Sequence, residues 1–147
     1  MTHILYLAIG IVMALAFCIM PTEIIESIYR PQGFSDELYN NSLYTPIALI
    51  ILAISWASAA VYYYVINSVK FDRWMHWLIQ LMLTAIAGFA ACYGFMLSQM
   101  RSLNLGYQSE CFMAGLVDAA IVIVMYVIAS YSIRWWSSNC RHTPIPQ

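Results

Sequence analysis

The chain has 147 residues, of which 63% are hydrophobic and 9% are charged, and its formal net charge is −1. Soluble domains carry about 25% charged residues, so this composition excludes an ordinary soluble domain and predicts a polypeptide that lies mostly within a membrane. Nucleic acid is excluded as a partner, because 6 Lys and Arg residues make no basic surface that could neutralise phosphates. At roughly 20 residues for each span, the apolar segments predict four crossings.

The first predicted span covers residues 3–20. No basic residue precedes it and no small-x-small cleavage site precedes Pro21, so we interpret it as an uncleaved span rather than a signal peptide. Residues 21–43 follow as an acidic external loop. Isoleucines recur within this loop at near-helical spacing, which predicts a short surface helix from Glu23 to Arg30. Ser35 is expected to cap the next turn.

The second predicted span, residues 44–66, and the third, residues 74–98, flank a cytoplasmic loop at 67–73. Asp72 is expected to cap the third span. Small residues recur on one face of both spans. Such faces suit close helix packing in lipid and indicate nothing further.

A second external loop is predicted at 99–111, the fourth span at 112–133 and a cytoplasmic tail at 134–147. Two prolines in this tail predict that it is extended and mobile. The predicted fold class is all-α, a single domain of residues 1–147 folded as a polytopic, antiparallel four-transmembrane-helix bundle. Helices are expected because a backbone amide in lipid must find its partner within its own segment.

The distribution of basic and aromatic residues predicts the orientation of the bundle. Four cations fall on the side of the termini and of loop 67–73, and two fall on the other side: Lys70, Arg73, Arg134 and Arg141 against Arg30 and Arg101. Under the positive-inside rule both termini are therefore cytoplasmic, in a plasma (inner) membrane. Aromatic anchors are predicted at the same interface: Trp74, Trp77, Trp135 and Trp136, with Tyr62, Tyr63 and Tyr64.

Asp118 is the one ionisable acid inside a predicted span. A charge at the bilayer centre costs about 2.5 to 3.5 kcal/mol on insertion scales, so this side chain is expected to face the bundle or a wet crevice. Tyr93 lies at matching depth on the third span and is the predicted hydrogen-bond partner. Two interpretations stay open, a proton or cation site and a neutral polar clamp that fixes helix register.

Gln80 and Thr84 lie one turn apart on the third span and complete the candidate intramembrane polar site. The Thr84 hydroxyl can donate to the backbone carbonyl of Gln80. The two residues either line a polar path or make interhelical hydrogen bonds worth below about 2 kcal/mol each.

No metal or cofactor site is predicted. His76 lies between two tryptophans and lacks a second histidine at matching depth, so we interpret it as an interfacial residue rather than a haem ligand. The four cysteines show no CxxC spacing. Isolated thiols are the favoured interpretation, and a disulfide between Cys18 and Cys111 is the other. No nucleotide-binding, hydrolase or metalloprotease motif occurs, so no enzyme is predicted.

Two function classes follow. The first is a non-enzymatic anchor or scaffold subunit of a larger membrane assembly, whose partners are the lipid bilayer and another membrane protein or a second copy. The second is a homo-oligomeric ion or proton channel with Asp118 in the conduction path. The first rests on the lack of a catalytic constellation and on loops too small for a separate domain, and the second rests on Asp118.

Overall fold

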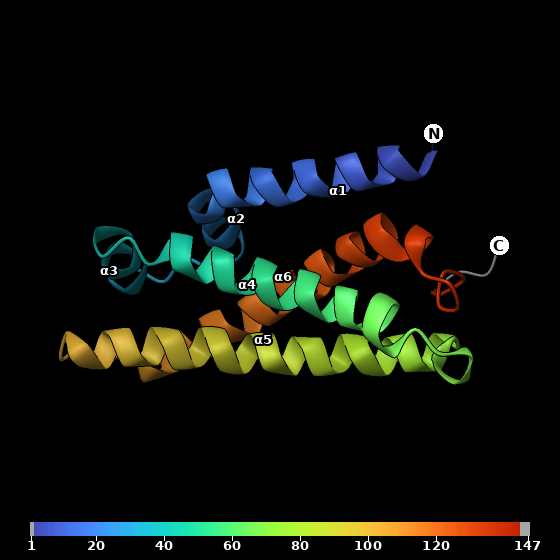
Figure 1. Ribbon diagram of the computed structural model, residues 1–147. Coiled ribbons are helices and arrows are strands. Elements are labelled where there is room, and N and C mark those ends of the chain that lie inside the picture. Colours follow the sequence, from blue (N-terminus) through green and yellow to red (C-terminus); the bar gives the residue numbers. More distant parts are fainter. Residues whose placement is uncertain (1, 145–147) are drawn as a thin grey trace.

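The computed structural model describes residues 2–144, and every regular element within that range is a helix. Four long helices run alternately up and down (Figure 1). They are α1 (Thr2–Ile19), α4 (Tyr44–Ala60, continued by the π-helical turn η1, Val61–Ile66), α5 (Trp74–Ser102) and α6 (Gln108–Ile133). Four short helices complete the chain: α2 (Pro21–Ile28), α3 (Phe34–Asn40), η2 (Val69–Phe71) and η3 (Arg134–Trp136). The prediction of an all-α chain is confirmed.

Three helices are long and apolar enough to cross a membrane, and the bent pair of α1 and α2 is a fourth candidate. Their bounds follow the predicted spans closely at residues 44, 66, 74 and 133. Both ends of the chain lie at one end of the bundle, beside the turn that joins η1 to α5 (Figure 1). The elements α2 and α3 and the turn between α5 and α6 lie at the opposite end.

Helices α4, α5 and α6 form the closely packed core of the molecule. Gly88 lets α5 approach α6, since a Cβ atom at Gly88 would lie 2.6 Å from a methyl carbon of Val122. On the other side of Val122, its carbonyl accepts a hydrogen bond of 3.2 Å from the Ser55 hydroxyl of α4. Val122 therefore lies where all three helices meet, which matches the close approach that small residues permit in lipid.

Helix α1 lies at the edge of this core and contributes one large side chain, Phe17, to it. Gly10 and Phe17 are its only buried residues within 3–19. It crosses α6 at Gly10, where an added Cβ atom would collide with the Ser132 side chain. With 18 residues α1 is about 27 Å long, whereas α5 has 29 residues and is about 44 Å long.

The first predicted span ends at a sharp bend. The axes of α1 and α2 differ by 81°, because a proline at position 21 disfavours helical geometry at Met20. The predicted surface helix is present as α2, although it begins at Pro21 and ends at Ile28. It is tied to α4 by Glu26, which accepts a hydrogen bond of 2.9 Å from the Tyr44 hydroxyl.

The predicted caps at Ser35 and Asp72 are wrong. Helix α3 begins after Gly33, whose φ of 81° favours glycine, and Ser35 is buried inside the helix. Helix α5 begins after Arg73, with no side-chain cap, and Asp72 ends the preceding turn η2.

The second external loop is shorter than the predicted range of 99–111. Helix α5 continues to Ser102 and α6 begins at Gln108. The reason is a stripe of residues four apart, Cys92, Met96 and Met100, which are all buried and carry α5 past its polar residues. Asn104, with φ of 57°, makes the turn.

The described part of the tail, residues 134–144, is folded against the bundle, which corrects the prediction of an extended segment. Asn67, with φ of 25°, holds it. The Asn67 side-chain oxygen accepts hydrogen bonds of 2.9 Å from the Ser137 hydroxyl and 2.9 Å from the Asn139 amide. The Asn139 side chain donates back to the Asn67 carbonyl at 2.7 Å. We call this contact the tail latch.

Three consecutive tyrosines strengthen the same end of the bundle. The hydroxyl of Tyr62 donates to the carbonyl of Phe71 at 2.9 Å, that of Tyr63 to Thr143 at 3.1 Å and that of Tyr64 to Ile133 at 2.9 Å. Tyr62 and Tyr63 are buried. Their rings are therefore not presented at the surface, because the π-helical turn directs them toward the turn and the tail.

Candidate functional site

Asp118 lies in the core of α4, α5 and α6 and is only 1% exposed. Neither carboxyl oxygen has a hydrogen-bond partner among the described residues. The group that interacts with it electrostatically is the thiol of Cys92 on α5, which is itself fully buried. A buried polar group without a partner costs about 1–3 kcal/mol, so Asp118 is not explained as a hydrogen-bonded clamp.

Tyr93, the predicted partner of Asp118, faces another direction. Its ring stacks on Phe89 at a centroid distance of 5.6 Å and meets the edge of Phe112 at 6.1 Å. Because consecutive residues of a helix point about 100° apart, Cys92 takes the position toward Asp118 and Tyr93 is turned away. The predicted hydrogen bond is therefore wrong, although the predicted depth led to the neighbouring residue.

Gln80 and Thr84 lie two to three turns from the level of Cys92. The Thr84 hydroxyl donates to the Gln80 carbonyl at 2.7 Å, as predicted. Thr84 precedes Cys92 by eight residues, or about 12 Å of helix. The Val122 side chain occupies the space beside Gly88, which lies between them. The four candidate residues thus occupy three separate environments and do not line one continuous path.

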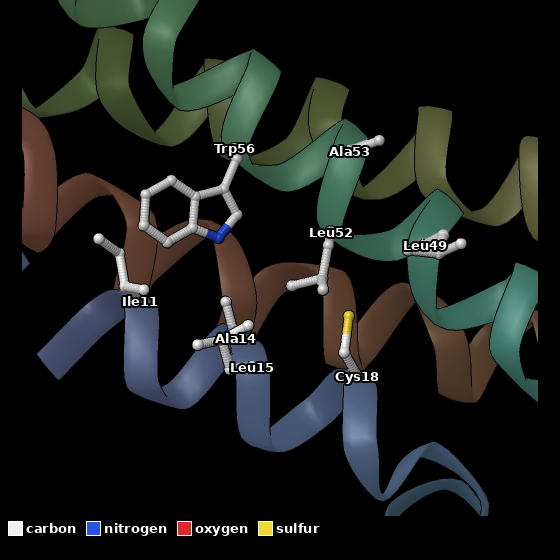
Figure 2. A pocket seen from close by; sticks show the side chains of 8 residues that line it. All are labelled: Ile11, Ala14, Leu15, Cys18, Leu49, Leu52, Ala53 and Trp56. Carbon is white, nitrogen blue, oxygen red and sulfur yellow. The ribbon is translucent and has the colours of Figure 1, made fainter. Parts of the chain in front are cut away.

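An apolar groove of about 440 Å³ separates α1 from α4. Figure 2 shows its two walls facing each other, Ile11, Ala14, Leu15 and Cys18 from α1, and Leu49, Leu52, Ala53 and Trp56 from α4. The Trp56 indole nitrogen is buried and has no hydrogen-bond partner in the described part of the chain. Sequence reasoning missed this groove, since it depends on how far apart two separate helices are held.

The residues predicted to anchor loop 67–73 at the interface divide into two groups. Lys70, Arg73 and Trp74 are exposed, and Trp74 is 54% exposed. Trp77 faces inward instead, and its indole nitrogen donates to the Ser130 hydroxyl at 3.2 Å. Trp77 therefore joins α5 to α6, and its ring is buried rather than presented at the surface.

The anchors after α6 show the same division. Trp136 is exposed, whereas Arg134 is buried and its guanidinium lies 4.3 Å from the ring centre of Trp135. The Trp135 ring in turn stacks on Tyr6 of α1 at 5.5 Å. This aromatic contact is a second attachment of α1, at the end of the bundle near both termini.

All four cysteines are free thiols, so the favoured interpretation of isolated thiols is confirmed. Cys140 is buried under the tail latch, and burial raises the pKa of its thiol. Within residues 2–144, no three His, Cys, Asp or Glu side chains are grouped so that they could hold a metal ion.

Comparison of the chain with protein-family models, with curated proteins and with solved structures finds no match.

Proposed function

We propose that this chain is a non-enzymatic anchor or scaffold subunit of a larger membrane assembly. In this proposal both termini and loop 67–73 are cytoplasmic in a plasma (inner) membrane, and α1 with α4 forms the face that receives a partner. The partner is a transmembrane helix of another subunit or of a second copy. The orientation rests on the distribution of cations described above.

The observation that carries this proposal is the loose seat of α1. The core helices meet at Gly88 and at the Ser55 hydrogen bond, and α1 meets α6 at Gly10. On its other side α1 leaves a groove beside α4, with small side chains, Ala14 and Ala53, on both walls. Small residues are what lets one helix backbone approach another in lipid, where no hydrophobic force drives association. A helix seated in this groove would gain the packing that α1 alone does not supply.

A polar atom in the groove supports the same conclusion. The Trp56 indole N–H is buried without an acceptor. If the Trp56 ring turns toward the groove when a partner helix binds, a hydroxyl or carbonyl oxygen of that helix would accept this N–H, at a gain of roughly 1 kcal/mol in lipid.

Photo-crosslinking in native membranes tests this proposal. A photoreactive residue at Leu15, on the groove, is expected to form an adduct with one defined membrane polypeptide. The same residue at Ile86, on the exposed face of α5, is expected to label lipid.

A matched pair of variants identifies the groove itself. Ala53→Leu fills the groove and is expected to abolish the Leu15 adduct, whereas Ala90→Leu, at an exposed position of α5, is expected to leave it unchanged. A chain recovered only as an isolated monomer, or an adduct that survives Ala53→Leu, contradicts the proposal.

A second candidate function is the proton or ion channel, favoured by one observation, the unpaired carboxyl of Asp118. The burial of Asp118 weighs against the channel, since a pore between copies of the chain is lined by the outer surfaces of the protomers. Flux through reconstituted vesicles decides between the two functions. If the chain is a scaffold, no flux is expected. A flux that is lost in Asp118→Asn would contradict the scaffold and support the channel.

A further inference from the structure

A small pocket lies beneath the turn between η1 and α5, at the end of the bundle that holds the tail latch. Its volume is about 170 Å³, and it is lined by Tyr62, Ile66, Phe71, His76, Ile79 and Gln80. The lining is amphipathic, because the aliphatic and aromatic side chains surround one imidazole and one amide. The function proposed above uses none of these residues.

One polar atom among the residues that line this pocket has no partner in the described part of the chain. The Nδ1 atom of His76 is buried and makes no hydrogen bond to any described residue. The ring packs against Phe71 in a T-shaped contact with the ring centroids 5.0 Å apart, and the Phe71 carbonyl accepts a hydrogen bond from the Tyr62 hydroxyl. The imidazole of His76 therefore has a fixed place in the lining of the pocket.

Two cations lie beside the pocket. Lys70 directly precedes the lining residue Phe71 and Arg73 follows it by two residues, so both belong to the turn that covers the pocket. Both are exposed, and the one side-chain ion pair found among residues 2–144 lies elsewhere, between Arg30 and Glu26. Asp72 is the single carboxylate of this turn, which leaves a net charge of +1 toward the solvent.

The surface around these cations is strongly apolar. Exposed large side chains surround the turn: Val69, Phe71, Trp74, Met75 and Ile79. Cations interleaved with exposed aromatic and aliphatic groups are typical of a segment at the boundary between lipid tails and headgroups. An occupant of the pocket must therefore be anionic at one end and apolar at the other.

We propose that this pocket binds one anionic phospholipid of the adjoining leaflet. Its phosphate lies between Lys70 and Arg73. The amide of Gln80 and the imidazole of His76 donate to the ester carbonyl oxygens, and an acyl chain runs along Ile66 and Ile79. Each part of the lipid thus meets a group of matching chemistry, with the phosphate contacts supplied as point charges.

Native mass spectrometry of the delipidated, full-length protein tests this proposal with defined lipids. Phosphatidylglycerol is expected to be retained in preference to phosphatidylcholine. The double variant Lys70→Gln/Arg73→Gln is expected to weaken retention by about fivefold for each cation removed. Arg101→Gln, which removes an exposed cation from the opposite end, is the control and is expected to retain phosphatidylglycerol as the unchanged chain does.

A second variant separates the pocket from the cations. His76→Phe/Gln80→Leu keeps the net charge and is expected to lower phosphatidylglycerol retention, while its unfolding in detergent without added lipid stays unchanged. Three outcomes would overturn the site. They are equal retention of the two lipids, a loss of phosphatidylglycerol retention in Arg101→Gln as large as in Lys70→Gln/Arg73→Gln, and unchanged retention in His76→Phe/Gln80→Leu. Glycerol phosphate that stabilises the protein as well as the lipid does would overturn its assignment to a lipid. None of these readouts depends on a protein partner, so the scaffold proposal stands or falls separately.

Discussion

The three core helices and α1 are all apolar, yet different contacts hold them in the bundle. In the core, Gly88 and Ser55 bring α5 and α4 against the same residue, Val122. Helix α1 meets α6 at Gly10 and rests on Trp135 near its start, with a groove along its other side.

The difference shows that hydrophobicity does not decide which helices pack together in lipid. Lipid tails are as apolar as leucine, so burial of apolar surface drives no association there. Close approach at glycine and hydrogen bonds at the ends of the helices take over that role. Four sets of variants test this difference.

Gly88→Leu should cause the largest loss of stability, because the added side chain meets Val122 at the crossing of α5 and α6. Overpacking of this kind costs typically about 1–3 kcal/mol, and we expect the upper end of that range. Unfolding by SDS in mixed micelles measures it. Gly94→Leu is the control, since a Cβ atom at Gly94 meets nothing within 4 Å. Equal loss in both variants would show that the crossing is not specific.

Asn67→Gly should cost about 2 kcal/mol, because it removes the side-chain oxygen that accepts two hydrogen bonds and leaves their donors unpaired. Glycine keeps the positive φ available, so the loss reports the side chain alone. Hydrogen exchange of residues 137–143 should rise at the same time. Asn104→Gly, at a second position of positive φ, is the control. Unchanged exchange in Asn67→Gly would contradict the tail latch.

Asp118→Leu should raise the free energy of unfolding by about 1 kcal/mol, since it replaces an unpaired buried carboxyl with an apolar side chain of similar shape. Asp118→Asn keeps a polar group of the same size and should give no such gain. SDS unfolding of the two variants measures the difference. A loss of stability in Asp118→Leu would mean that the carboxyl has a partner in the folded protein.

Gly10→Leu should change the global unfolding least, because it separates α1 from α6 without entering the core. The expected result is faster alkylation of Cys18 by a membrane-permeant maleimide, with unfolding shifted by less than about 1 kcal/mol. Ala8→Leu, at an exposed position of the same helix, should leave the alkylation rate unchanged. A large loss of global stability in Gly10→Leu would show that α1 is held as tightly as the three core helices.

The sequence was sufficient to predict the class of the fold and most helix ends. Apolar runs bounded by Pro21, Asn67 and Asp72 leave little freedom in where the helices begin and end. The error at 99–111 came from polar residues on the exposed face of α5, which hid a buried stripe four residues apart. That stripe was present in the sequence and could have been found by its period.

The candidate site was harder to predict, because it depends on rotation and on distant contacts. Depth along a helix could be counted from the sequence, and it selected Tyr93 instead of its neighbour Cys92. Which of the two faces Asp118 depends on the packing of α5 on α6. The tail latch joins residues 72 apart, and no local pattern encodes which amide the Asn67 side chain will meet.

The unequal lengths of α1 and α5 have a consequence for the surrounding membrane. A hydrocarbon layer is about 30 Å thick, which α1 barely spans before the chain turns away at Met20, whereas α5 exceeds it by several turns. As membrane spans, these two helices would require the lipids beside α1 to compress and α5 to lean or project into the headgroups, at a cost that rises with each ångström of mismatch. The protein would thus favour a thinner bilayer beside α1 than beside α5.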